Sequence, residues 1–301
     1  MKISLASIPY FWQREEYFDF YEQLSDTNVD IVYLGETICS KRRALKLEDW
    51  MDISDKLFNS GKQVVLSTMT LLESVSELKY LNKIASQKTF LIEANDVAAI
   101  QLAKNHDHQF VAGCAINIYN KATFDILRKS GMTRWVVPVE MGKEDISPLI
   151  SHAKKHQIEI EYQAFGRMPL AYSARCFSAR HYQRPKDNCQ FVCQKDPQGI
   201  LVKSREGEHF AQINGIQTQS ATVTNLLNYY KDLHDSGIDV LRIVPVDASD
   251  TLVVINSLSK VIGDSNNDQT SKDLLLSEQL NNDYSFCNGY WFQMPGIKMV
   301  S

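Results

Sequence analysis

Residues 30–67 read DIVYLGETICSKRRALKLEDWMDISDKLFNSGKQVVLS and contain one strand–helix–strand unit. The apolar runs at 30–35 and 62–67 predict two buried strands, and the segment 45–58 between them has a helical pattern. The helix is predicted to end at Asn59-Ser60-Gly61, because a glycine just past the last apolar position usually stops a helix. Buried strands joined by a helix are typical of a parallel sheet.

The same unit recurs along the chain. Predicted strands begin near residues 2, 30, 62, 89, 109, 133, 158 and 238. Further helices are predicted at 122–129 and 225–234, each followed by a glycine. Eight strands alternating with helices predict an α/β fold of the (β/α)₈, TIM-barrel-like type. The alternative is an open doubly wound sheet, but no G-x-G-x-x-G motif follows any strand to support its dinucleotide-binding form.

One interval departs from this rhythm, because about 80 residues separate the strand near 158 from the strand near 238. We predict a single barrel-type domain over residues 1–301, with a cysteine-bearing insertion after strand seven at about 166–237. An extra strand is expected inside it at 208–213. A polar, flexible loop at 263–272 is predicted to open a C-terminal tail at about 263–301.

Composition excludes several classes of protein. The formal net charge of −4 gives no electrostatic reason to expect a nucleic-acid partner. No apolar run reaches the roughly 18 residues that a membrane span requires. The apolar start is interrupted by Pro9 and followed by charged residues, unlike a signal peptide. We therefore expect a cytoplasmic protein, in which cysteines act as metal ligands, reactive thiols or packing residues rather than disulfides.

Four cysteines form a candidate metal-binding set. Cys176, Cys189 and Cys193 have the spacing C-x₁₂-C-x₃-C within the insertion, and Cys39 follows the second strand. Loops after strands two and seven both belong to the C-terminal face of a barrel, so the four thiols are expected on one face. Three interpretations stay open: an iron–sulfur cluster, a structural zinc ion, or ordinary buried cysteines.

Polar residues at strand ends are candidates for substrate binding or proton transfer. Glu36, Glu93 and Glu140 each end or follow a predicted strand, and Ser67 and Asn117 hold equivalent positions. In a barrel these residues rim one mouth. The alternative is that they cap helices and bond to loop backbone.

Arginines flank the candidate ligands. Arg175 directly precedes Cys176, and Arg42 and Arg43 lie three and four positions after Cys39. Such residues offset the charge of thiolates or bind an acidic ligand through paired N–H groups. Surface solvation is the competing interpretation.

Five other residues are assigned structural roles. His152 and His156 have the i, i+4 spacing of a metal site, but a solvated helix face is the preferred interpretation. Cys114, within a predicted strand, and Cys287 are not assigned as ligands. Trp291 is expected in the core or an interface, with contact to a hydrophobic ligand as the alternative.

Several longer motifs resemble the collagenase-like peptidase family. They are GETICSKRR (35–43), FLIEA (90–94), WVVPVE (135–140), LAYSARCFSAR (170–180), RPKDNC (184–189), NGIQT (214–218) and CNGYW (287–291). The match extends over essentially the whole chain. Peptide hydrolysis itself finds little support, because no His-Glu-x-x-His or Gly-x-Ser-x-Gly motif and no evident cysteine–histidine pair is present.

The resemblance is strongest to a branch that acts in anaerobic ubiquinone biosynthesis, and it implies several properties. A [4Fe–4S] cluster is implied as the cofactor, with Cys39, Cys176, Cys189 and Cys193 as its ligands. The implied enzyme is an oxygen-independent ring hydroxylase, in which the chain forms a heterodimer with a UbiU-like subunit. A UbiT-like lipid-binding protein, a hydrophobic quinone precursor and a prephenate-like oxygen donor are its implied partners.

Two alternatives to this implied role stay open. In the first alternative, the chain is a non-catalytic scaffold or a redox-sensing subunit. In the second it is an RNA-base hydroxylase of the same family, which the acidic charge balance disfavours.

Overall fold

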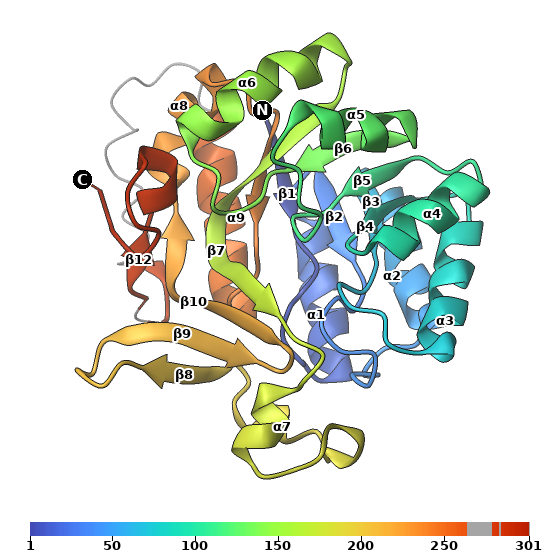
Figure 1. Cartoon of the computed structure of the whole chain (residues 1–301), viewed down its shortest axis with the longest axis vertical. Helices are drawn as coiled ribbons and strands as arrows, with labels where there is room; N and C mark the ends of the chain where they lie inside the picture. The colour runs from blue at the N-terminus through green and yellow to red at the C-terminus, as the bar shows by residue number, and fades with distance from the viewer. Residues whose placement is uncertain (264–278, 283, 301) are drawn as a thin grey trace.

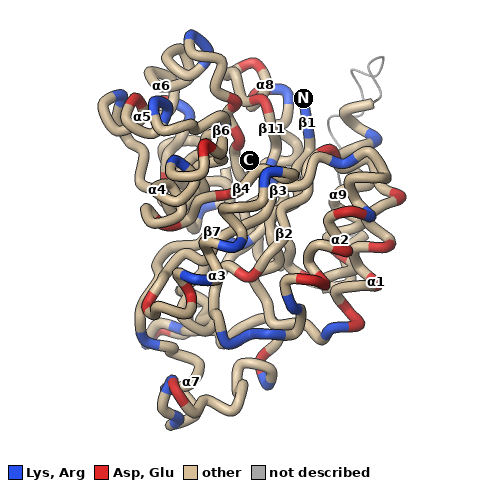
Figure 2. Tube along the Cα trace, turned by 90° about the vertical axis from the view of Figure 1, so that its right-hand side faces the viewer, with Lys and Arg blue, Asp and Glu red and all other residues tan. Residues whose placement is uncertain are grey.

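The computed structural model describes residues 1–263, 279–282 and 284–300. Apart from Gly263 itself, the polar loop predicted at 263–272 lies outside the described residues. Among the described helices, none is long and apolar enough to cross a lipid bilayer. Lys and Arg positions are interspersed with Asp and Glu positions along the outer helices (Figure 2).

Eight parallel strands form a closed barrel (Figure 1). Each strand pairs with the next in the chain, and the last pairs with both the first and the seventh, which closes the ring. Lys2 lies beside Val240, and Val240 lies beside Glu161. The strands are β1 (Lys2–Leu5), β2 (Ile31–Leu34), β3 (Gln63–Ser67), β4 (Leu91–Ala94), β5 (Phe110–Ala112), β6 (Met132–Val136), β7 (Glu159–Tyr172) and β11 (Val240–Ile243). The predicted (β/α)₈ fold is confirmed.

Helices follow the strands and form an outer layer. They are α1 (Arg14–Ser25), α2 (Leu47–Asn59), α3 (Val75–Ser86), α4 (Val97–Asn105), α5 (Lys121–Lys129), α6 (Lys143–Lys155), α8 (Tyr230–Asp235) and α9 (Ala248–Gly263). Side chains at their starts satisfy free backbone N–H groups, as where Asp96 accepts from Ala98 at the start of α4. The short α8 replaces much of the longer helix predicted at 225–234, because residues 227–229 form a 3₁₀ turn, η3 (Leu227–Tyr229).

Two separate apolar clusters stabilise this architecture. The larger cluster fills the layer between the outside of the barrel and the helices. The smaller lies inside the barrel and consists of Ile31, Tyr33, Val65, Val111, Val136 and Val240. Both faces of each barrel strand are therefore buried, which explains why the strands are continuous apolar runs rather than alternating patterns.

The seventh strand continues beyond the barrel and supports the inserted segment. At Gly166 the backbone has a φ of +110°, and an added Cβ atom would lie 2.4 Å from the Val244 carbonyl oxygen. Only glycine fits this close approach. The outer part of β7 then pairs antiparallel with β10 (Gln217–Asn225), and Tyr172 lies opposite Gln217.

The remaining elements of the insertion pack on this extension. They are α7 (Phe177–His181), η1 (Lys186–Asn188), η2 (Val192–Lys195), β8 (Ile200–Lys203) and β9 (His209–Asn214), and the sheet continues in the order β10–β9–β8. Figure 1 shows α7 and the β8–β9 hairpin beyond the carboxyl ends of the barrel strands. The tail returns through β12 (Phe286–Cys287), which pairs with β10, and η5 (Gly289–Phe292).

The strand expected at 208–213 corresponds to β9, whereas β8 and β10 were not predicted. The sequence of β10, QTQSATVTN, is almost entirely polar and reads as a loop. Its glutamines are nevertheless buried, because β7, β9 and the barrel mouth surround them. Tertiary contacts here override the residues' low hydrophobicity.

Candidate metal centre and barrel mouth

The four predicted cysteines lie in loops on the C-terminal face of the barrel. Cys39 lies between β2 and α2, Cys176 is the N-cap of α7, Cys189 follows η1, and Cys193 lies within η2. Electrostatic interactions connect Cys39 with Cys176, and Cys193 with both Cys176 and Cys189. The structure thus brings together thiols that are up to 154 positions apart (193 − 39).

The environment of these thiols combines burial with nearby positive charge and N–H donors. Burial raises the pKa of Cys39, while the Lys41 backbone N–H and the charge of Arg42 oppose this rise. Burial likewise raises the pKa of Cys193, against the opposing effect of Arg42. The Ala179 backbone N–H donates to Cys176 Sγ at 3.4 Å. Positive charge and N–H donors near sulfur stabilise thiolate ligands and tune a cluster that they hold.

Thiolate sulfur is a ligand both for a structural zinc ion and for an iron–sulfur cluster. The chemistry of the four-cysteine donor set therefore fits either group.

Arg42 is a buried cation beside the cysteines. Its side chain is 5% exposed, and its Nη1 and Nη2 atoms donate to the Pro9 carbonyl at 2.8 Å and to Asn214 Oδ1 at 2.7 Å. Burial disfavours its charge, but Glu36, Cys193 and Cys39 outweigh that effect and raise its pKa. The guanidinium is therefore held as a fixed positive charge among the thiols.

The other basic residues near the cysteines are less buried than Arg42. Lys41 Nζ donates to the Lys186 carbonyl at 2.7 Å and to Asp187 Oδ1 at 3.1 Å, which joins the Cys39 loop to η1. Arg43 and Arg175 are exposed. Only Arg42 of the three predicted arginines is thus buried against the thiols.

A pocket lies in the mouth of the barrel. Its floor includes Glu93 and Arg242 from the barrel strands, and its wall includes Arg167, Tyr172 and Gln217 from β7 and β10. The inserted segment therefore covers part of the mouth. The complete lining also contains Ala6, Ser7, Pro9, Thr37, Thr70, Asn95, Cys114, Val136, Val137, Val139, Gln163, Pro169, Gln219 and Val244.

Hydrogen bonds connect the cysteine region to this pocket. Arg42 and Asn214 both donate to the Pro9 carbonyl, which lies at the pocket wall. Asn214 Nδ2 also donates to Gln217 Oε1 at 3.4 Å, and Gln217 Nε2 donates to the Tyr172 hydroxyl at 3.0 Å. A continuous polar network thus runs from the thiol side of Arg42 to groups facing the pocket.

The pocket floor is a buried ionic network. Arg242 donates from Nη2 to Glu93 Oε1 at 2.6 Å and from Nη1 to Glu161 Oε1 at 2.7 Å. Ser4 and Tyr33 also donate to Glu161, at 2.8 Å and 2.5 Å. Both carboxylates are at most 1% exposed, so each depends on these donors to offset the loss of water.

The three glutamates predicted to rim the mouth occupy different environments. Glu93 lines the pocket, but Arg242, Ser67 and Asn95 all donate to its carboxylate, which suits it to fixing Arg242. Glu36 accepts from the backbone N–H groups of Ile38 and Cys39 at 2.8 and 3.0 Å, so it shapes the cysteine loop. Burial raises the pKa of Glu36.

Glu140 is exposed and accepts a hydrogen bond from the Tyr119 hydroxyl. Glu36, Glu93 and Glu140 therefore differ in burial and in hydrogen-bond partners. Asn117 is also exposed, whereas Ser67 is buried against Glu93.

The residues given structural roles also have defined places. Cys114 lies two positions beyond the end of β5 rather than inside the strand, and it lines the mouth, where burial raises its pKa to about 11. Cys287 is fully buried in β12. Trp291 packs on Tyr162 and donates to Asp232 Oδ2 at 2.8 Å, so it anchors the tail.

Sequence reasoning missed most of the pocket lining, including Gln163, Arg167, Tyr172, Gln217 and Arg242. Two signals were present. Tyr172 and Gln217 lie inside motifs that carried the family resemblance, and Arg242 is a charged residue within an otherwise apolar strand. A charge in a strand buried on both faces requires a buried partner.

Two solved structures have a distant likeness to this chain. Dihydropteroate synthase from Anaplasma phagocytophilum is 8% identical, with 87% of this chain and 99% of that chain covered and a TM-score of 0.38. The HPPK-DHPS protein of Plasmodium falciparum with pteroate is 10% identical, with 90% and 48% covered and a TM-score of 0.38. This chain spans about half the length of the Plasmodium protein. At these values the likeness carries no inference about function.

A family model gives a direct assignment. The model described as Peptidase family U32 matches residues 18–300, which include all four candidate cysteine ligands and the described insertion. This match confirms the family named by the sequence resemblance. The chain belongs to peptidase family U32.

Proposed function

We propose that this chain is the iron–sulfur subunit of an oxygen-independent ring hydroxylase for ubiquinone precursors, of the UbiV branch of its family. The observation that carries the proposal is the grouping of four cysteines, two of which, Cys39 and Cys193, interact with the buried Arg42 beside the barrel mouth. The proposed ligands are Cys39, Cys176, Cys189 and Cys193, and the proposed partner is a UbiU-like subunit. A UbiT-like lipid-binding protein would present the hydrophobic precursor.

The residues of this chain support such a role in specific ways. A bound [4Fe–4S] cluster supplies one-electron transfer, at a potential set by nearby charge, hydrogen bonds and exposure. Arg42 provides a fixed positive charge at the thiols, and Asn214 and Gln217 extend its hydrogen-bond network to the pocket. Arg167 lines the pocket, where its charge suits a carboxylate-bearing oxygen donor of the prephenate type.

Peptide hydrolysis is less well supported despite the family's name. Neither the candidate ligand set nor the described lining of the mouth contains a histidine, which a cysteine nucleophile would require as its base. The Cys114 thiol in the mouth has a pKa raised to about 11 by burial, which disfavours its nucleophilic form.

The function is tested with the chain purified without oxygen together with its UbiU-like partner. The pair, given a ubiquinone precursor and prephenate, is expected to yield the ring-hydroxylated product. Cys176→Ser is expected to abolish product formation while pairing survives. Product formation by a cluster-free pair would instead support the scaffold role. RNA retained at moderate salt, with no product, would support the RNA-base alternative.

Arg42 offers a separate test of the cluster environment. Replacing it with glutamine removes the fixed positive charge, so we expect the cluster's reduction potential to fall by on the order of 60 mV. A dye-mediated redox titration followed by electron paramagnetic resonance measures this shift. Arg42→Lys keeps the charge and serves as the control. An unchanged potential in Arg42→Gln protein that retains its iron would contradict the assigned role.

A further inference from the structure

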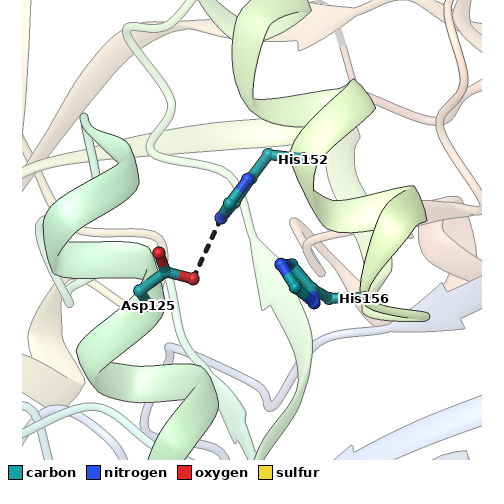
Figure 3. A group of neighbouring side chains, drawn as sticks. All are labelled: Asp125, His152 and His156. Carbon is teal, nitrogen blue, oxygen red and sulfur yellow. Dashed lines mark hydrogen bonds and ion pairs between the residues drawn. The ribbon is translucent and has the colours of Figure 1, made fainter.

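The outer layer contains another group of side chains that could hold a metal ion, on α5 and α6 and separate from the four cysteines. His152 and His156 lie on successive turns of α6 and face Asp125 on α5 (Figure 3). One ligand atom from each residue lies within 4.8 Å of the others. The sequence favoured a solvated helix face for the histidines. Instead all three residues are partly buried, and the carboxylate comes from a neighbouring helix.

Aromatic contacts orient the two imidazoles. The His152 ring packs edge-on against Phe124, with ring centroids 5.5 Å apart, and against His156 at 4.8 Å. His152 Nε2 already lies 3.0 Å from Asp125 Oδ1. Both side chains therefore present nitrogen atoms to the gap between α5 and α6 without large rearrangement (Figure 3).

The ligand chemistry fits a transition-metal ion. Zinc bonds of about 2.0–2.2 Å to nitrogen and oxygen hold tetrahedral ligands roughly 3.3 Å apart, so small side-chain rotations would close the present spacing. Burial lowers the pKa of His156, and the charges of Arg128, His152 and Lys155 lower it further. Metal ions bind the neutral imidazole that this environment favours.

Arg128 competes directly for the carboxylate of Asp125. Arg128 Nε lies 3.3 Å from the same Asp125 Oδ1 atom that His152 approaches. A metal ion at the site would displace this guanidinium and would be repelled by its charge. Arg128 is therefore expected to lower the affinity of the site for a metal ion, so replacing Arg128 should raise that affinity.

We propose that Asp125, His152 and His156 form a binding site for a single divalent transition-metal ion of the zinc type, joining α5 to α6. Two imidazoles and one carboxylate leave a coordination position open for water. His156 is the C-cap of α6 and precedes β7, so the site lies toward the amino ends of the barrel strands, away from the cysteine loops. The site does not depend on the proposed hydroxylase function.

Zinc titration of matched variants tests the site. Isothermal titration with Zn²⁺ compares wild type with His156→Gln and Asp125→Asn, each with its cluster assembled without oxygen. We expect each variant to bind one equivalent less, or to bind it about tenfold or more weakly. Arg128→Gln is expected to tighten the same equivalent. His234→Gln, which alters an exposed histidine on α8, is the control and should match wild type.

The design separates this site from the cysteines. Zinc bound by free thiols would be equal in wild type and His156→Gln, so only the difference between them reports on the site. Equal zinc stoichiometry and affinity in wild type, His156→Gln and Asp125→Asn would overturn the proposal. Melting curves without zinc show whether the variants remain folded, and those curves should coincide.

Discussion

Replacing Cys176 with alanine is expected to reduce the iron content from about four atoms per chain to less than one, with acid-labile sulfide lost in parallel. Cys176 interacts with both Cys39 and Cys193, so it is central to the candidate ligand set. The variant leaves three candidate thiolate ligands and one iron without a protein ligand, so we expect the cluster to be retained less well. Iron, sulfide and zinc analysis of protein purified without oxygen measures the change.

Matched variants separate loss of the ligand from loss of local structure. Cys176 Sγ caps α7 by accepting from the Ala179 N–H, and serine preserves such a cap. Cys176→Ser should therefore lose iron as alanine does, while α7 stays formed. Cys287→Ser, at a buried cysteine outside the set, should keep its iron. Full iron in Cys176→Ala protein, or one zinc without sulfide in wild type, would contradict the cluster assignment.

Replacing Arg242 with leucine is expected to lower the free energy of unfolding by about 3–5 kcal/mol. The change removes a cation shared by Glu93 and Glu161, which are at most 1% exposed. Glu161 keeps an ion pair with Arg134 at 3.8 Å, whereas Glu93 keeps only the neutral donors Ser67 and Asn95. The cost arises mainly from the buried Glu93 carboxylate rather than from lost packing, since leucine is apolar and fits a buried site. Urea unfolding followed by circular dichroism measures the effect.

A second change tests this cause directly. Adding Glu93→Gln to Arg242→Leu removes the charge that has lost its cation and should recover at least about 1 kcal/mol, because the two sites are coupled. Lys154→Ala breaks a partly exposed pair with Asp239 and should change stability by no more than about 1 kcal/mol. If Arg242→Leu and Lys154→Ala had equal effects, the buried network would not contribute as inferred.

Much of the barrel was accessible from the sequence. The units around DIVYLG and KQVVLS are strongly patterned, because strands covered on both faces must be apolar along their whole length. The face shared by Cys39 and Cys176 was also predictable, since loops after parallel barrel strands lie at one end. The polar strand β10 was not, because its burial comes from distant partners rather than from its own residues.

The fold class and the family followed from the sequence, because local periodicity and long motifs encode them, and the cysteine spacing predicted a candidate ligand set. The pairing of charges became visible with the tertiary structure. It buried Arg42 against the thiols while leaving Arg43 exposed, and it directed Glu93 to Arg242. Which groups pair depends on distances between residues far apart in the chain, so spacing within one strand or loop does not reveal it.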